Sequence, residues 1–492
     1  MHTKMLVAIA ETENLLPKNY AELSEEEKLQ ALCNTNGETN PSLYEDEFIR
    51  DSLLSFREVK NIQKQNGEAG CHRYIISHSK SPLSVMEVFG LFCLNGWQKE
   101  DLRIDIIPLF ETIDDLKQAP QIMQQLYANE TYRQHLRRRN NRQVIMVGFS
   151  DGTKDGGYLM ANWSIYKAKE ELTKGAKDND IEVVFFDGRG GPPARGGGKT
   201  HRFYASMGKN IAQNEIQLTI QGQTISSNFG TIDAARFNIE QLLNAGLGNS
   251  LFSKKESTLT EAEESLLQQM AETGYEAYLQ LKHHPAFIPY LEQVSPLNYY
   301  SETNIGSRPT KRKNTSLLSL NDLRAIPFVG SWSQIKQNVP GFYGVGAALK
   351  KMDEAGQLPA LKKMYRQSLF FKTLMDNCEM AMKKSFFPLT AYLSKHPDFG
   401  DIWNMIYREY ETTMDYVLRL TGNSSLMANY PVEELSIQMR ERIVLPLTTI
   451  QQYALSKLRD GENRLPAEHR QVLEKLVIRT SFGIINAVRN SA

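Results

Sequence analysis

Short apolar runs alternate with amphipathic stretches in the first 240 residues of the chain. Four of these runs, at 74–77, 104–110, 144–149 and 183–186, are rich in Ile, Val and Phe and have the length of buried β-strands. An alternation of strands with helical segments is typical of parallel α/β structure, because each helix carries the chain back to the start of the next strand.

The pattern changes after this region. At 216–229 polar and apolar residues alternate around Gly222, which predicts a hairpin or an excursion from the sheet. Beyond about residue 240 the helical period dominates. Thr260, with Glu263 three positions later, resembles a capping box that begins a helix running to about Lys282. Further long helices are predicted at about 359–395, 400–420, 432–459 and 466–488.

Composition excludes several classes of protein. With 41% hydrophobic and 23% charged residues, the 492-residue chain is expected to be an ordinary soluble globular protein. Basic and acidic residues each number 57, so no overall charge favours nucleic acid or an anionic membrane as a partner. The four cysteines lack zinc-site or disulfide spacing, and no apolar run reaches the ~20 residues that span a bilayer. A cytoplasmic location is expected.

Two predicted strands run directly into loops that hold glycines and charged side chains. The loop after 144–149 carries Asp151 and Lys154. A carboxylate suits a hard divalent cation and an ammonium suits a phosphate or carboxylate, although an ordinary solvated turn explains this loop equally well. The carboxyl ends of parallel strands build one edge, so successive loops of this kind predict an anion site there.

The loop after 183–186 carries Arg189 and Arg195 among glycines, whose bare backbone lets a ligand approach closely. Recognition of a phosphate or carboxylate follows. An RNA-binding arginine–glycine segment is the alternative, but such segments are repetitive and do not follow an apolar run. Glu111, just after 104–110, is placed to be a metal ligand at the same edge; the alternative is a helix cap or a solvated carboxylate.

The order of motifs in the chain carries a resemblance. The motifs are PLFET (108–112), GFSDGTKDGG (148–157), GRGGPPARGGGKTH (188–201), TIQGQTISSNFG (219–230), NIGSRPTKR (304–312) and LRAIPF (323–328). In this order they closely resemble the phosphoenolpyruvate carboxylase family over nearly the entire chain. The resemblance implies a carboxy-lyase that forms oxaloacetate and phosphate from phosphoenolpyruvate and bicarbonate, an anaplerotic fixation of carbon that feeds the tricarboxylic acid cycle.

The fold that the resemblance implies is α/β with predominant α. Residues 1–240 would form the carboxy-terminal strands of a (β/α)8 barrel with the metal and phosphate loops. Residues 241–492 would form a large α-helical region that completes the active site and carries an allosteric inhibitor site.

The resemblance also implies roles for individual residues. Glu111 and Asp151 match the ligands of Mg²⁺ or Mn²⁺. The residues matching the catalytic groups are Lys154, Arg189, Arg195 and Arg324. Those matching the substrate-binding groups are Arg189, Arg195 and Arg308. For Arg308 and Arg324, structural ion pairs are the alternative. Aspartate or malate would inhibit through Arg195, Lys384, Arg440 and Asn490; taken singly, the last three are also explained as surface or helix-end polar residues.

The sequence departs from the family pattern in three respects. Asp187 stands where the glycine loop of the family usually begins with histidine, and Lys336 stands where arginine is more common. Family members are also about twice as long, and the His-Pro-Thr motif of their amino-terminal part has no counterpart here. About the last four barrel strands are therefore expected, with exposed edges that another polypeptide would close.

Three hypotheses follow from these departures. The first is a phosphoenolpyruvate carboxylase, or the carboxy-terminal part of one that works with a separately encoded amino-terminal half. The second is a non-catalytic dicarboxylate-binding or regulatory fragment, and the third is a structural remnant without a function of its own. A homo-oligomer, typically a tetramer, is expected from the family.

Overall fold

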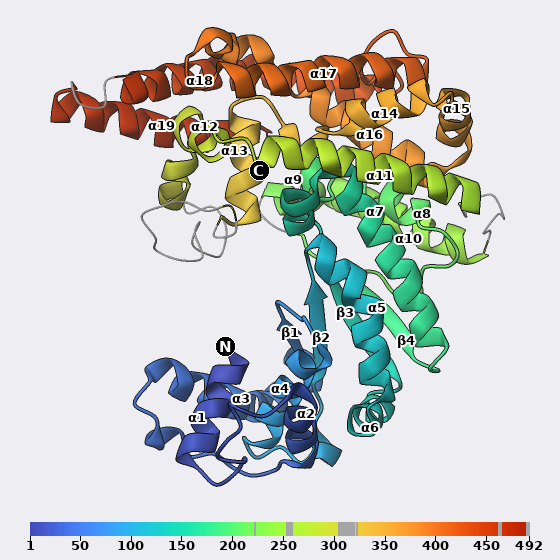
Figure 1. Ribbon diagram of the computed structural model, residues 1–492, viewed down its shortest axis with the longest axis vertical. Coiled ribbons are helices and arrows are strands. Elements are labelled where there is room, and N and C mark those ends of the chain that lie inside the picture. The colour runs from blue at the N-terminus through green and yellow to red at the C-terminus, as the bar shows by residue number, and fades with distance from the viewer. Residues whose placement is uncertain (221–222, 252–258, 304–319, 321–322, 461–464, 489–492) are drawn as a thin grey trace. The chain divides into compact units, whose positions relative to one another are not determined.

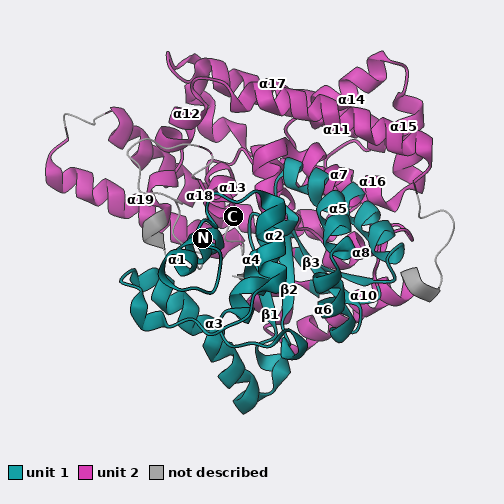
Figure 2. Cartoon of the chain, turned by 60° about the horizontal axis from the view of Figure 1, so that its bottom comes forward, with its two compact units in different colours: residues 1–148, 167–187, 214–217 teal, residues 149–166, 188–213, 218–492 magenta. Residues whose placement is uncertain are grey.

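The computed structural model describes residues 1–220, 223–251, 259–303, 320, 323–460 and 465–488. Of the described residues 70% are helical, and five strands form a curled sheet. Its backbone contacts divide it into two units that are discontinuous in sequence, as the colours of Figure 2 show. Unit 1 comprises Met1–Gly148, Lys167–Asp187 and Asn214–Gln217, and unit 2 comprises Phe149–Tyr166, Gly188–Gln213 and Leu218–Ala492. The domain boundary expected near residue 240 stays a prediction.

The strands of the sheet are adjacent in the order in which they occur along the chain. They are β1 (Arg73–Ile76), β2 (Asp105–Phe110), β3 (Arg142–Gly148), β4 (Glu182–Gly188) and the short β5 (Gln217–Leu218). β1 pairs with β2 in parallel, and β2 pairs with β3 in parallel. The four predicted strands are thereby confirmed. The five strands of the described residues fall short of the eight that close a barrel, so these residues do not form a complete (β/α)8 barrel.

Unit 1 holds this sheet against helices that connect its strands. The buried side chains of Ile107, Val144 and Val184, from three neighbouring strands, form one apolar cluster. The helices of unit 1 are α1 (His2–Thr12), α2 (Glu25–Asn34), α3 (Glu47–Asn66), α4 (Pro82–Cys93), α5 (Ile113–Ala128), α6 (Glu130–Arg138) and the second part of α7 (Ser150–Lys177). Helices α4 and α5 pack against β2, and α6 packs against β3.

Unit 2 is built mainly from helices. Besides the first part of α7 they are α8 (Thr200–Ser206), α9 (Gln223–Phe229), α10 (Ile232–Leu251), α11 (Glu261–Lys282), α12 (Phe287–Val294), α13 (Ala325–Gln334), α14 (Val345–Glu354), α15 (Leu358–Gln367), α16 (Leu369–Lys383), α17 (Gly400–Thr421), α18 (Pro431–Asp460) and α19 (Ala467–Val488). The long helices α18 and α19 run side by side, as do α14 and α17 (Figure 1). None of the helices in the described ranges combines the length and the apolar composition needed to cross a bilayer.

Several predicted helices are confirmed. The capping box is present: the Thr260 hydroxyl accepts from the backbone amide of Glu263, whose carboxylate accepts from the Thr260 amide, and α11 ends at Lys282. Helices α17, α18 and α19 match the stretches expected at 400–420, 432–459 and 466–488 within one or two residues.

Two sequence predictions are wrong. Of the two alternatives for 216–229, the hairpin is wrong: the described residues form a two-residue strand, β5, and helix α9, because an alternation over a few residues does not distinguish a strand from a short helix. Gly222 is outside the described residues, and the excursion from the sheet stays a prediction. The expected single helix at 359–395 is broken at Ser368, whose hydroxyl accepts from the amide of Phe371 and caps α16. A 3₁₀ helix, η8 (Phe387–Lys395), then ends the segment, with Pro388 in its first turn.

Candidate functional site

The first of the two glycine loops is the beginning of helix α7. Ser150 is the first residue of the helix, so Asp151 and Lys154 lie one turn apart on its first two turns. The Lys154 ammonium is 3.4 Å from Asp151 Oδ1 and donates a hydrogen bond of 2.7 Å to the backbone carbonyl of Leu323. Lys154 is 7% exposed, so its charge is held in a largely water-free place. The two residues predicted from this motif therefore form one ion pair.

Gly157 interrupts α7. Its backbone has φ +72° and ψ −176°, a conformation that favours glycine and kinks the helix. A Cβ at this position would also come within 2.9 Å of the Tyr278 ring. The Tyr278 hydroxyl donates to the carbonyl of Lys154, so α11 braces the segment that carries the ion pair.

The second glycine loop folds back on itself. The amide of Gly190 donates to the carbonyl of Arg195 at 2.7 Å, across the short 3₁₀ helix η4 (Pro193–Arg195). A Cβ on Gly190 would meet the Arg195 side chain at 2.7 Å, and a Cβ on Gly197 would clash with the carbonyl of Gly191. The glycines are therefore required for the close approach of two backbone strands, which brings Arg195 inward.

Arg195 is 3% exposed and lies beside the start of α7. Its Nε donates to the Ser150 hydroxyl at 3.0 Å. Burial lowers the pKa of Arg195 to about 10, while the charge of Asp151 opposes that shift, so the guanidinium stays positive at neutral pH. The structure thus brings the half-buried Asp151 and the buried Lys154 and Arg195 into one cluster of a carboxylate and two cations within unit 2.

Arg189 has a different environment. Its Nε donates to the carbonyl of Gly196 at 2.6 Å, and its guanidinium lies 4.0 Å from the centre of the Phe203 ring, a cation–π contact. A cavity next to it is lined also by Thr200 and His201. Burial, followed by the charges of Arg202 and Lys199, lowers the pKa of His201, so the imidazole is neutral at pH 7. Sequence analysis did not single out His201, although it ends the glycine-loop motif.

Glu111 belongs to unit 1, where it follows the last residue of β2. Its side chain lies against Gly148, the last residue of β3: a Cβ on that glycine would come within 2.9 Å of Glu111 Cγ. In the described ranges no three His, Cys, Asp or Glu side chains are grouped to hold a metal. Two carboxylates still fit Mg²⁺, which keeps several waters and substrate oxygens as ligands. Because Asp151 belongs to unit 2, the binding of one metal ion by both Glu111 and Asp151 stays a prediction.

One further predicted arginine, Arg324, lies at the margin of this cluster. Arg324 is the residue that precedes α13, directly after the Leu323 carbonyl that accepts from Lys154. Arg308 is outside the described residues.

Asp187, which stands where the family usually has histidine, forms a buried ion pair. Asp187, in β4, is 2.6 Å from the ammonium of Lys169, in the second part of α7, and their side chains are 1% and 2% exposed. The ammonium also lies 5.0 Å from the centre of the Phe185 ring. Asp187 is therefore a partner of Lys169, which sequence analysis did not identify because the two are 18 positions apart on different elements.

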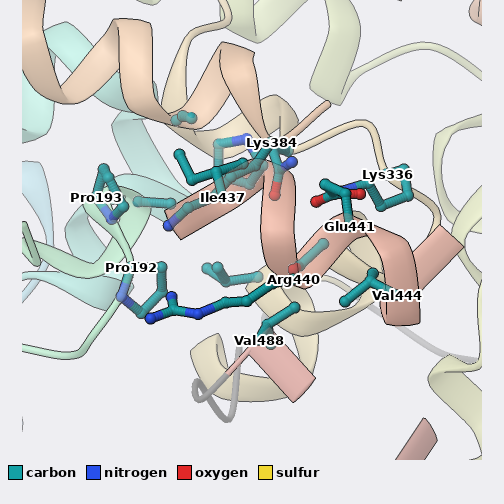
Figure 3. A pocket seen from close by; sticks show the side chains of 16 residues that line it. Pro192, Pro193, Lys336, Lys384, Ile437, Arg440, Glu441, Val444 and Val488 are labelled. Carbon is teal, nitrogen blue, oxygen red and sulfur yellow. The ribbon is translucent and has the colours of Figure 1, made fainter. Parts of the chain in front are cut away.

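Two residues of the predicted inhibitor site line one pocket of unit 2 (Figure 3). Lys384 follows the end of α16, and Arg440 lies on α18, with its side chain extending toward Pro192 of the glycine loop. Burial lowers the pKa of Lys384 to about 8, and the charges of Arg440 and Lys336 act in the same direction. Arg195 does not line this pocket, but the adjoining Ala194 does. Asn490 is outside the described residues.

The same pocket contains two charged residues that sequence analysis did not assign to it. Lys336 and Glu441 form an ion pair of 2.6 Å, with side chains 4% and 19% exposed. Lys336 had been noted only as a departure from the family arginine. The remaining walls are mainly apolar and include Ile437 and Val444 (Figure 3).

Comparison with known proteins agrees with the motifs. The family model described as phosphoenolpyruvate carboxylase matches residues 1–492. Among curated relatives, the phosphoenolpyruvate carboxylase of Corynebacterium diphtheriae is 33% identical over 494 residues, which cover 96% of this chain and 53% of the relative. That of Corynebacterium glutamicum is 34% identical with the same coverage, and that of Corynebacterium efficiens is 33% identical over 99% of this chain and 54% of the relative. The chain thus spans about half the length of these relatives, and it belongs to the phosphoenolpyruvate carboxylase family.

Proposed function

We propose that this chain contributes the cation-rich part of a phosphoenolpyruvate carboxylase active site. The observation that supports this proposal is the cluster of Asp151 with the buried Lys154 and Arg195 at the start of α7. Two fixed cations in a largely water-free place are suited to a substrate that carries a phosphate and a carboxylate. The known relatives carry the name of this activity, which supports the choice of substrate.

In the proposed reaction an oxygen of bicarbonate attacks phosphorus, and the bond from phosphorus to the enol oxygen breaks. This gives carboxyphosphate and the enolate of pyruvate, which then bonds to the carboxyl carbon as phosphate leaves. Lys154 and Arg195 would stabilise the charge that develops on the enolate oxygen, because preorganised cations act strongly where water is excluded. Arg189, Arg308 and Arg324 would bind the remaining anionic groups.

Glu111 and Asp151 would hold the Mg²⁺ or Mn²⁺ that the family uses. When bound, the ion supplies positive charge near the phosphoryl and enolate oxygens. Both side chains offer hard oxygen ligands, which is the chemistry that these cations prefer.

The half of the family protein that this chain does not span is part of the proposal. It would supply the remaining strands of the barrel and the histidine motif absent from this sequence, as a separate polypeptide or a further segment. Homo-oligomeric assembly, as a tetramer, and a cytoplasmic location belong to the same proposal.

A second candidate function rests on the pocket that contains Lys384 and Arg440. Two cations in one pocket suit a dicarboxylate such as aspartate or malate. In an enzyme the ligand would inhibit by acting through η4, because Ala194 lines the pocket and Arg195 follows it in the chain. A regulatory module would bind the same ligand without turnover.

The deciding experiment measures oxaloacetate formation from phosphoenolpyruvate, bicarbonate and Mg²⁺ by this chain, alone and mixed with the amino-terminal half of a relative. Turnover in either case that is lost in Arg195→Ala, and that needs more metal in Asp151→Asn, supports the enzyme. Glu434→Gln, which alters a carboxylate that lines neither site, is the control. Dicarboxylate binding without turnover in any mixture would support the regulatory module.

A further inference from the structure

Two further pockets of unit 2 meet at Thr373 and Asn377, which lie one turn apart on α16 and line both of them. The first, which we call the aromatic pocket, is bordered by aliphatic side chains and by the rings of Phe149, Tyr166, Phe203 and Phe370. The second, which we call the charged pocket, contains Lys199, Arg202, Asp376 and Glu433 beside Met380, Met427 and Tyr430. Neither shares a lining residue with the pocket of Lys384 and Arg440.

Arg202 is the most loosely held charge of the charged pocket. Its guanidinium is 3.7 Å from Asp376 Oδ2, which is longer than a hydrogen bond, and 4.6 Å from the centre of the Tyr430 ring. Its side chain is 34% exposed. The N–H groups of such a guanidinium can bind a carboxylate through two parallel hydrogen bonds.

Asp376 does not depend on Arg202 for its hydrogen bonds. Oδ1 accepts from the Tyr365 hydroxyl at 2.8 Å and from the Lys372 ammonium at 3.1 Å. Oδ2 accepts from Lys372 at 3.1 Å and from the Tyr430 hydroxyl. Arg202 can therefore turn to the carboxylate of a ligand without leaving Asp376 unsatisfied.

The other groups of the two pockets restrict the ligand further. Lys199 is paired with Glu433, so a second anionic group would come next to Glu433 and Asp376, which disfavours dicarboxylates and phosphates. The hydroxyl of Thr373 is buried and has no hydrogen-bond partner among the described residues, although it lies where the pockets meet. The rings that border the aromatic pocket favour an aromatic body, because aromatic groups attract one another in offset and edge-to-face contacts.

We propose that the two pockets together bind a small aromatic monocarboxylate. Its carboxylate binds Arg202 and accepts from the Thr373 hydroxyl, and its ring lies in the aromatic pocket. This site is distinct from the proposed inhibitor site, and binding to it does not depend on the proposed activity.

A ligand at this position would contact side chains that hold the second glycine loop. Asn377 Nδ2 donates to the carbonyl of Gly197 at 3.4 Å, and a Cβ on Gly198 would come within 2.4 Å of Asn377 Oδ1. The Phe203 ring, which borders the aromatic pocket, also carries the guanidinium of Arg189. The amides of Gly197 and Gly198 donate to carbonyls within the loop, so binding should slow their hydrogen exchange about threefold or more.

Calorimetric titration of the chain with phenylacetate, benzyl alcohol and acetate tests the binding. Phenylacetate has the ring and the charge, benzyl alcohol has only the ring, and acetate has only the charge. The expected dissociation constant for phenylacetate is on the order of 1 mM, with the other two at least about tenfold weaker. Hydrogen exchange of the glycine loop, measured by mass spectrometry with and without phenylacetate, tests the coupling.

Substitutions locate the site. Arg202→Gln should weaken phenylacetate about tenfold or more and leave benzyl alcohol unchanged, whereas Thr373→Val should weaken phenylacetate about threefold. Arg419→Gln is the matched control, because Arg419 also lies 4.6 Å from a tyrosine ring and pairs with an aspartate but lines neither pocket. It should leave the binding of phenylacetate unchanged, as should Lys384→Gln.

Each contrary result overturns a stated part of the proposal. If the wild-type chain binds benzyl alcohol or acetate as tightly as phenylacetate, ring and charge are not recognised together; this comparison needs no variant and holds even if Arg202→Gln does not fold. Binding that is lost in Lys384→Gln and kept in Arg202→Gln would place the ligand in the other pocket. Binding without slower exchange at Gly197 and Gly198 would refute the coupling to the glycine loop.

Discussion

Two lysine–carboxylate pairs in this protein have the same nitrogen–oxygen distance, 2.6 Å, and different access to solvent. Lys169 and Asp187 of unit 1 are 2% and 1% exposed, whereas Lys336 and Glu441 of unit 2 are 4% and 19% exposed and line a pocket. Both pairs include a residue that departs from the family pattern. Distance alone therefore does not indicate what an ion pair does.

The difference lies in what each carboxylate can still reach. Asp187 is enclosed within unit 1, so its pair can position β4 and the glycine loop that follows but is closed to a ligand. Glu441 lines a pocket and retains a buried oxygen that has no hydrogen-bond partner among the described residues. A third pair, Lys383 with Glu434, has the same distance and is 24% and 21% exposed, so it completes a series of increasing exposure.

The largest loss of stability is expected when the buried pair of Lys169 and Asp187 is changed. Asp187→Asn removes the counter-charge that Asp187 supplies to the buried Lys169, which should lower the free energy of unfolding by about 3–5 kcal/mol. Urea-induced unfolding followed by circular dichroism measures this. The double variant Lys169→Met with Asp187→Leu removes both charges and should recover most of the loss. A cost below about 1 kcal/mol for Asp187→Asn would mean that water reaches the pair.

A smaller loss of stability is expected when the pair of Lys336 and Glu441 is changed. Glu441→Gln should lower the free energy of unfolding by about 2 kcal/mol, between the values typical of buried and exposed pairs. Burial lowers the pKa of Lys336 and Glu441 opposes that shift, so the variant should lower it further. Because Lys336 then loses its proton more easily, the deficit should shrink as the pH rises. A deficit that is constant from pH 7 to 10 would contradict this account.

The sequence predicted the elements that depend on local pattern. The four strands of the sheet are apolar runs, and α11 begins at a capping box within a single turn of chain. The break at Ser368 was missed because the apolar periodicity of α15 continues into α16, while the cap depends on one hydroxyl. Helix α9 was missed because its seven residues are too few for a period to be distinguished.

The candidate site shows the same limit more clearly. Asp151 and Lys154 were predicted together because they lie one helical turn apart in a recognisable motif. The pairing of Lys336 with Glu441 joins residues 105 positions apart, and no pattern in a single sequence predicts such a contact. Chemistry that arises from local spacing could be predicted, whereas the partners that tertiary packing supplies could not.

Lys384 lines the same pocket as Glu441, and its titration offers a pH-dependent test of dicarboxylate binding. Lys384 has a pKa of about 8 and faces Lys336, Arg440 and Glu441. Its ammonium binds a carboxylate only when protonated, so affinity should be nearly constant below pH 7.5 and should fall about tenfold between pH 7 and 9. Malate is the suitable ligand, because it has no amine that titrates in this range. Lys384→Arg should remove most of the decrease; a decrease that remains would assign the titration to Lys336.

The smallest effect is expected at the most exposed pair of the series. Glu434→Gln should change the free energy of unfolding by ~1 kcal/mol or less, because water solvates the Lys383 charge that remains. The same urea-unfolding measurement applies, and 0.5 M salt should reduce the difference further, since screening weakens exposed pairs most. If the three variants instead lost equal amounts of stability, burial would not be the property that distinguishes the pairs. A graded loss, from Asp187→Asn through Glu441→Gln to Glu434→Gln, would show that equal distances at three levels of exposure correspond to three different energies.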